Sequence, residues 1–73
     1  PNTKIDFSIP KNSVVSIKIY DVLGKEVAVL VNKDLKIGSY TVDFNASTLT
    51  SGVYFYKITA GDYTDTKKLV LVK

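Results

Sequence analysis

Apolar and polar residues alternate along most of this 73-residue chain, and no segment carries the repeat of an amphipathic helix. The segment from residue 5 to residue 9 shows the pattern clearly, because its odd positions are apolar, its even positions are polar, and Pro10 interrupts it. Alternation with a period of two places apolar side chains on one face of a strand. The sequence therefore predicts a protein built from half-buried β-strands.

Six segments carry such strand patterns, with turn residues between them. The third segment, residues 26–31, has apolar residues in succession, so we expect it to be covered on both faces. Residues 32–38 contain three charged side chains and are expected to form an exposed loop. The predicted strands are residues 5–9, 15–19, 26–31, 40–44, 52–59 and 63–72.

Turn residues separate the predicted strands. Asp21 can cap a turn over residues 21–25 through its carboxylate, and a tight turn is expected at residues 60–62 between the last two strands. Residues 45–51 are rich in Ser and Thr and are expected to cross between sheets, with Leu49 as their apolar contact. Glycine adopts positive φ angles at low cost. The glycines expected at turns are Gly24, Gly38, Gly52 and Gly61.

Short strands at spacings of about ten residues favour two antiparallel sheets packed together. The arrangement Leu49-x-x-Gly52-x-Tyr54 is similar to the corner where an immunoglobulin-like (Ig-like) chain crosses between sheets. In that corner a tyrosine hydroxyl bonds back to the backbone upstream. We therefore predict an all-β fold, an Ig-like antiparallel β-sandwich of six to seven strands. A seventh strand would be missing, too short to assign, or supplied by residues before Pro1.

The small size of the chain limits its stability. A domain of this size buries only about 60% of the surface of its unfolded chain. The sequence has no Cys and no His, so neither a disulfide nor a typical structural metal site can compensate. Burial of apolar side chains, which make up 45% of the residues, must hold this single domain together.

The last predicted strand reaches the end of the sequence. Leu69, Val70, Leu71 and Val72 follow one another there, and we expect a sheet to cover them. This strand is also a candidate for a sheet edge. Lysines on edge strands deter unwanted pairing, and Lys67 and Lys68 lie in the same segment.

The sequence lacks the usual catalytic groups. Without His or Cys, the common arrangements of nucleophile and base are unavailable, and no G-x-S-x-G motif occurs. The carboxylate pairs Asp62 with Asp65 and Asp21 with Glu26 flank turns, whereas glycosidase chemistry needs two carboxylates that face each other across a bound sugar. We expect no enzyme activity, no cofactor and no metal site.

The charged residues do not indicate a nucleic-acid partner. The net charge of +3 comes from lysines spread among carboxylates, and the chain has no Arg, the residue that most often contacts phosphates and guanine. No apolar run approaches the roughly 18 residues of a transmembrane helix. The first residues do not form a signal peptide.

Taken together, the motifs resemble a known family across essentially the whole chain. The similar segments are T-K-I-D-F-S-I-P, V-S-I-K-I-Y-D-V-L-G-K-E-V-A-V-L-V, G-S-Y-T-V-D-F-N-A and S-G-V-Y-F-Y-K-I-T-A-G, followed by K-K-L-V-L-V-K. They resemble the type A C-terminal sorting domain of type IX secretion cargo, also called the Por secretion system. The middle segment alone is also similar to Ig-like modules of flagellar hook-capping proteins.

The resemblance implies a function in protein export. Such a domain follows a large secreted enzyme or adhesin in bacteria of the Bacteroidetes type, and residues 1–73 would be one domain excised from such a protein. The cargo crosses the inner membrane with its own signal peptide, and an outer-membrane translocon recognises the folded domain. A sortase-like surface peptidase often removes it. The expected location is therefore secreted or cell-surface, reached through the periplasm and outer membrane.

The resemblance and the last strand together suggest the residues that the translocon recognises. A receptor can recognise an exposed strand by adding a strand of its own. We expect Gly52 and Tyr54 to hold the scaffold for this strand. The expected recognition residues are Lys67, Lys68, Val70 and Lys73.

Two alternatives remain open. The domain could be a passive Ig-like spacer or accessory module inside a multidomain extracellular enzyme. It could also bind carbohydrate through a platform of aromatic side chains, although tyrosines distributed over several strands are more often half-buried sheet residues. The tyrosines concerned are Tyr20, Tyr40, Tyr56 and Tyr63.

Overall fold

The computed structural model describes residues 2–72 and contains six antiparallel strands, which confirms the predicted all-β sandwich. No helix occurs in the described part of the chain. A seventh strand is likewise not found in residues 2–72. The strands are β1 (Asn2–Ile9), β2 (Ser13–Tyr20), β3 (Glu26–Leu35), β4 (Gly38–Asn45), β5 (Gly52–Ala60) and β6 (Tyr63–Leu71).

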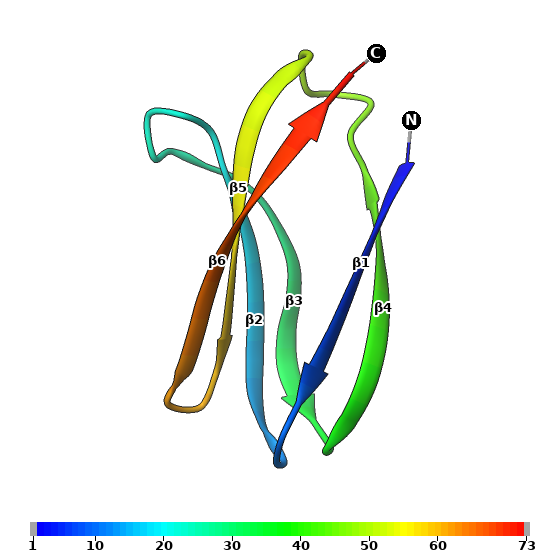
Figure 1. The fold of residues 1–73 in the computed structure, drawn as a ribbon, viewed down its shortest axis with the longest axis vertical. Coiled ribbons are helices and arrows are strands. Elements are labelled where there is room, and N and C mark those ends of the chain that lie inside the picture. The colour runs from blue at the N-terminus through cyan, green and yellow to red at the C-terminus, as the bar shows by residue number, and fades with distance from the viewer. Residues whose placement is uncertain (1, 73) are drawn as a thin grey trace.

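The strands form two sheets of unequal size (Figure 1). One sheet pairs β1 with β4, and the other has the order β3-β2-β5-β6. An Ig-like sandwich with its B and E strands in one sheet and its C′, C, F and G strands in the other has the same order. In this comparison β5 is strand F and β6 is strand G, so the predicted Ig-like topology is also observed.

Apolar side chains from both sheets meet between the layers and form the core. Val15, Ile17 and Ile19 on β2 are completely buried, because alternation turns all three toward the smaller sheet. No buried side-chain nitrogen or oxygen within residues 2–72 lacks a hydrogen-bond partner. The other buried core residues, from both sheets and from the connection after β4, are Ile5, Phe7, Ile9, Val31, Phe44, Ala46, Tyr54, Ile58, Ala60 and Leu71.

The third strand differs from its prediction. β3 lies at the edge of the larger sheet, and only one of its faces is covered by the core. Its register against β2 shifts twice, which leaves Val27 and Leu30 as extra residues on β3. Each β-bulge resets the alternation by one residue. Apolar residues can therefore follow one another and still face the core, whereas Val29 points outward and is 49% exposed.

Two other predictions at strand ends need correction. Residues 32–35 belong to β3 rather than to an exposed loop, and charged side chains occur there because the edge of the sheet is open to solvent. At the other end of the chain, the sheet covers Leu71 but not its neighbours. Val70 is 56% exposed and Val72 is 84% exposed, because alternate residues of a half-covered strand face solvent.

The turn between β2 and β3 is built as its residues predict. The Asp21 carboxylate accepts hydrogen bonds from the backbone N–H groups of Leu23 and Lys25, both at 2.9 Å. Gly24 donates its N–H to the carbonyl of Asp21 and has a φ of 83°, a left-handed conformation that glycine adopts at low cost. This turn positions the end of β2 that lies beside the start of β5.

Candidate recognition surface

Strand β6 lies at the edge of the larger sheet. It pairs with β5 along its length and with no other strand in the described chain. One side of β6 therefore presents backbone N–H and C=O groups without a strand partner, a geometry to which another strand can be added. Figure 1 shows this strand crossing the front of the molecule.

The two adjacent lysines of β6 lie on opposite faces of the sheet. Lys67 is opposite Tyr56, whose side chain packs against the core, whereas Lys68 is opposite Phe55 on the outer face. Val70 is opposite Val53 and shares the outer face with Lys68. The structure therefore divides the predicted recognition residues.

The structure brings together only some of the predicted recognition residues. Lys73 lies outside the residues that the structure describes. Only Lys68 and Val70 share one surface, while Lys67 faces the smaller sheet. The outer face of the larger sheet and its β6 edge are thus the surfaces on which the predicted residues meet.

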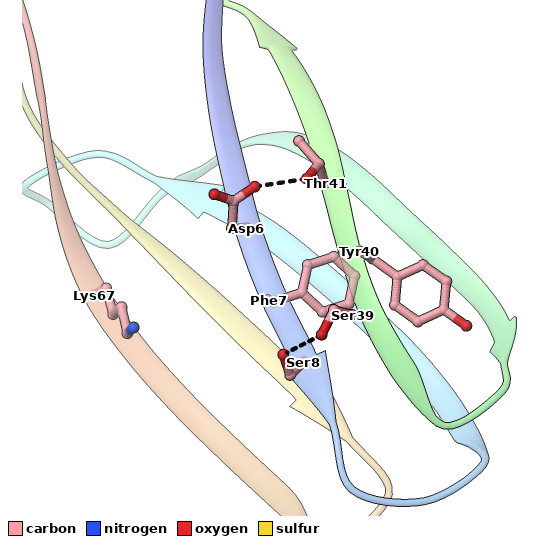
Figure 2. A pocket seen from close by; sticks show the side chains of 7 residues that line it. All are labelled: Asp6, Phe7, Ser8, Ser39, Tyr40, Thr41 and Lys67. Carbon is pink, nitrogen blue, oxygen red and sulfur yellow. Dashed lines mark hydrogen bonds between the residues drawn. The ribbon is translucent and has the colours of Figure 1, made fainter.

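Lys67 borders a shallow groove of about 520 Å³ (Figure 2). The groove continues over β1 and β4, where the Thr41 hydroxyl donates to the Asp6 carboxylate at 2.6 Å. The hydroxyls of Ser8 and Ser39 form a second cross-strand hydrogen bond at 3.0 Å. The groove is therefore mostly polar, and its hydroxyl and carboxylate groups on β1 and β4 already bond to one another.

The start of β5 is held by a tyrosine hydrogen bond. Tyr54 is 7% exposed, and its hydroxyl donates to the backbone carbonyl of Thr50 at 2.8 Å. Its oxygen is also 3.4 Å from the Thr50 hydroxyl. Gly52, with a φ of 153°, lies between the two residues and opposite Leu71 of β6. This corner fixes the start of β5, which pairs with the last residues of β6.

The other glycines singled out from the sequence also have positive φ angles. Gly24 has a φ of 83°, Gly38 of 152° and Gly61 of 61°. Gly61 also donates its N–H to the carbonyl of Val14, which ties the β5–β6 turn to the start of β2. All of them lie at or beside strand ends.

Two ion pairs form on the surface of the described chain. Lys4 is 3.3 Å from Asp43, and Lys18 is 3.4 Å from Glu26. All four side chains are substantially exposed, so each pair contributes little to stability. Within residues 2–72, Lys67 and Lys68 take part in no ion pair and present their charge to solvent.

The described residues do not assemble a metal or sugar site. No group of three or more His, Cys, Asp or Glu side chains lies close enough to bind a metal ion in residues 2–72. The tyrosines considered for a sugar platform do not share one surface, because Tyr40 and Tyr56 pack against the core while Tyr20 faces outward. Tyr63 lies at the β5–β6 turn, where its hydroxyl is 3.4 Å from Asp65.

The sequence patterns did not single out Phe55, nor its position beside Tyr20 on the outer face. Tyr20 is directly opposite Phe55, and Phe55 is directly opposite Lys68. Directly opposed residues in an antiparallel sheet have side chains on the same face, in contact range. Alternation in β2 and β5 indicates that both aromatics avoid the core, but only the register shows that they meet beside Lys68.

Comparison with protein families gives one match that spans the sequence. A family model described as "Secretion system C-terminal sorting domain" matches residues 1–73. Searches of curated proteins and of solved structures return no significant match. Residues 2–72 contain no helix that could span a membrane.

Proposed function

Because this chain belongs to the secretion system C-terminal sorting domain family, we propose that its signal is recognised at the open edge of β6. The domain is a sorting signal for type IX secretion, and it directs export to the cell surface or the medium. Domains of this family act as signals and not as catalysts. The single observation that supports recognition at β6 is its position as an edge strand with an unpaired backbone side.

Strand addition explains how an edge can be recognised. A partner strand that pairs with β6 gains affinity from backbone hydrogen bonds, while side chains at alternate positions supply selectivity. Lys68 and Val70 are two residues apart, so they present a charge and an apolar group on the same face of such a pair. These two side chains therefore select the partner from the outer face.

The remaining predicted residues have different positions in this proposal. Lys67 acts from the opposite face, where it borders the groove over β1 and β4. Lys73, which lies outside the described residues, remains a predicted recognition residue. Gly52 and Tyr54 act indirectly, because they hold the end of β5 that pairs with Leu71.

The partners follow from the family. A sorting domain implies the type IX machinery and an upstream cargo. We propose that the outer-membrane translocon is the component that binds β6, and that a sortase-like surface peptidase acts afterwards. In this proposal residues 1–73 form a single Ig-like module of a larger secreted protein.

A reporter fusion tests this proposal. Residues 1–73 are placed behind a signal peptide, a fluorescent reporter and a flexible linker, in a host with type IX secretion. We expect the wild-type fusion to reach the surface or medium and Lys68→Glu to accumulate in the periplasm. Lys33→Glu, an exposed reversal on the opposite edge strand, is the matched control. Equal export of all three fusions would refute recognition at β6, and retention of a folded wild-type fusion would refute sorting.

A further inference from the structure

The outward side chains of the larger sheet form rows that cross its strands. In one row, Tyr20 of β2 is opposite Phe55 of β5, and Phe55 is opposite Lys68 of β6. Glu26 of β3 extends this row on the other side of Tyr20. Neighbours in such a row contact one another across the strands. The row therefore joins the two aromatic residues to the β6 edge.

Apolar side chains collect at one end of this outer face. Val53 is opposite Val70 in the row next to the aromatic pair, and Val70 is 56% exposed. Val22, which is 65% exposed, lines a shallow pocket of about 280 Å³ together with Val53. We call the residues Tyr20, Val22, Val53, Phe55 and Val70 the apolar end.

The opposite end of the same face is polar apart from Val14, which is 58% exposed. Ser16 of β2 is opposite both Asn32 of β3 and Thr59 of β5, and Thr59 is opposite Thr64 of β6. This end needs no partner, because its small polar groups are suited to water. Contiguous exposed apolar groups, by contrast, mark interaction sites on soluble proteins. The face is therefore divided between a solvated end and an end suited to contact.

Lysines border the apolar end. Lys18 and Lys57 form the adjoining part of the face, and Lys68 lies beside Phe55. Glu26 balances only Lys18, with which it forms an ion pair at 3.4 Å. No ion pair involves Lys57 or Lys68 within residues 2–72. The border of the apolar end thus carries uncompensated positive charge.

We propose that the apolar end, with its lysine border, is a docking surface for a partner protein that presents apolar side chains bordered by carboxylates. Complementary charge selects such a partner and suppresses others. A second copy of this chain fits poorly, because its own apolar end is bordered by the same unpaired lysines and not by carboxylates. This inference rests on the proposed function and extends it from the β6 edge to the adjoining face.

The docking surface is continuous with the edge. A strand added to β6 lies next to Lys68 and Val70, which belong to the edge strand and the outer face at once. A partner bound at the edge therefore reaches Phe55 and Tyr20 by extending over the sheet. Buried aromatic side chains are common binding hot spots, so these two are expected to dominate the contact.

Two sets of variants of the reporter fusion test the docking surface. Phe55→Thr removes the central aromatic group but keeps a side chain suited to a strand, and Thr59→Ser is the matched control on the polar end of β5. We expect the exported fraction to fall about tenfold for Phe55→Thr and to stay unchanged for Thr59→Ser. Circular dichroism and thermal melting check that each variant is folded. If Phe55→Thr does not fold, the exported fraction of the double reversal Lys57→Glu with Lys68→Glu tests the docking surface instead.

Carbodiimide coupling tests the carboxylate border directly, because it joins lysine amines to carboxylates in contact. We expect a coupled peptide that links Lys57 or Lys68 to an acidic residue of an outer-membrane type IX component. The double variant Lys57→Arg with Lys68→Arg keeps the charge, so it should be exported normally but lose the coupling.

The outcomes separate the two proposals. Retention of the wild-type fusion refutes the proposed function itself. Normal export of folded Phe55→Thr overturns the docking surface while leaving sorting and recognition at β6 intact. If Phe55→Thr does not fold, normal export of the Lys57→Glu and Lys68→Glu double variant overturns both the docking surface and recognition at β6, while sorting stays intact. Coupling through other lysines only, with Lys57 and Lys68 unmodified by the partner, overturns it as well.

Discussion

The hydroxyl of Tyr54 donates a hydrogen bond to the backbone carbonyl of Thr50 over 2.8 Å and so closes the connection that leads from β4 into β5. Tyr54 lies opposite Leu69, so the same side chain that fixes this corner also lies beside the end of β6. The corner therefore connects the packing of the sandwich to the position of the edge strand. We therefore expect a substitution of Tyr54 to lower the free energy of unfolding.

Replacing Tyr54 by phenylalanine should lower the free energy of unfolding by about 1 kcal/mol, the typical net contribution of one hydrogen bond. The ring stays in the core, and only the hydroxyl is lost. Urea denaturation measures the change. Tyr56→Phe is the matched control, because the described structure shows no hydrogen bond from the Tyr56 hydroxyl. Equal midpoints for Tyr54→Phe and wild type would mean that the corner bond has no net effect on stability.

Gly24→Ala should destabilise the domain by about 1 to 2 kcal/mol, because an L-residue is strained at a φ of 83°. No atom outside the adjacent residues lies within 4 Å of the added Cβ, so the cost is conformational rather than steric. Gly24→Asn should cost less, since asparagine tolerates this conformation. Thermal melting of both variants checks the order, and an alanine variant as stable as wild type would contradict it.

Ile17→Ala should cost about 2 to 5 kcal/mol, because it removes buried volume from a completely buried position in the middle of the core. A loss of that size is a large part of the total stability of a small domain. Val29→Ala, at a position 49% exposed on the outer face, should cost much less. Chemical denaturation compares the two. Similar losses would mean that β3 is covered on both faces after all.

Lys67→Glu and Lys68→Glu should each change the free energy of unfolding by less than about 0.5 kcal/mol, the usual range for exposed positions without specific partners. Neither lysine has an ion pair in residues 2–72, so reversal of its charge breaks no ion pair. Guanidinium denaturation measures both variants. A loss above 1 kcal/mol for either one would show that the lysine supports the fold, and its effect on export would then need another explanation.

The alternation of side chains predicts the strands because burial on one face decides both sequence and structure. Ile17 and Phe44 each lie in a segment with clean alternation, and both are buried as expected. The pattern fails on β3 and, for the coverage of Val70 and Val72, at the end of β6. Bulges at Val27 and Leu30 conceal its period, and the charges at Lys33 and Asp34 suggest a loop although they belong to an open edge.

The composition of the recognition surface could be predicted only in part. Alternation along one strand separates Lys67 from Lys68 and places Val70 with Lys68, so that division was available from the sequence. The contact of Tyr20 with Phe55 was not, because it depends on which strands are neighbours and on their register. Local sequence patterns indicate neither the order of the strands nor their register, because the packing of the whole sandwich decides which strands pair.

Recognition of β6 depends on a folded body that holds this strand in place. Export of the reporter fused to Ile17→Asp tests this claim most directly, since a carboxylate at a completely buried site costs several kcal/mol and unfolds a domain this small. Ser16→Asp, next in sequence on the outer face, is the control. We predict that the Ile17→Asp fusion remains in the periplasm although its β6 sequence is intact, while Ser16→Asp is exported. Wild-type export of an unfolded Ile17→Asp fusion would show that a linear peptide is recognised and would contradict the account.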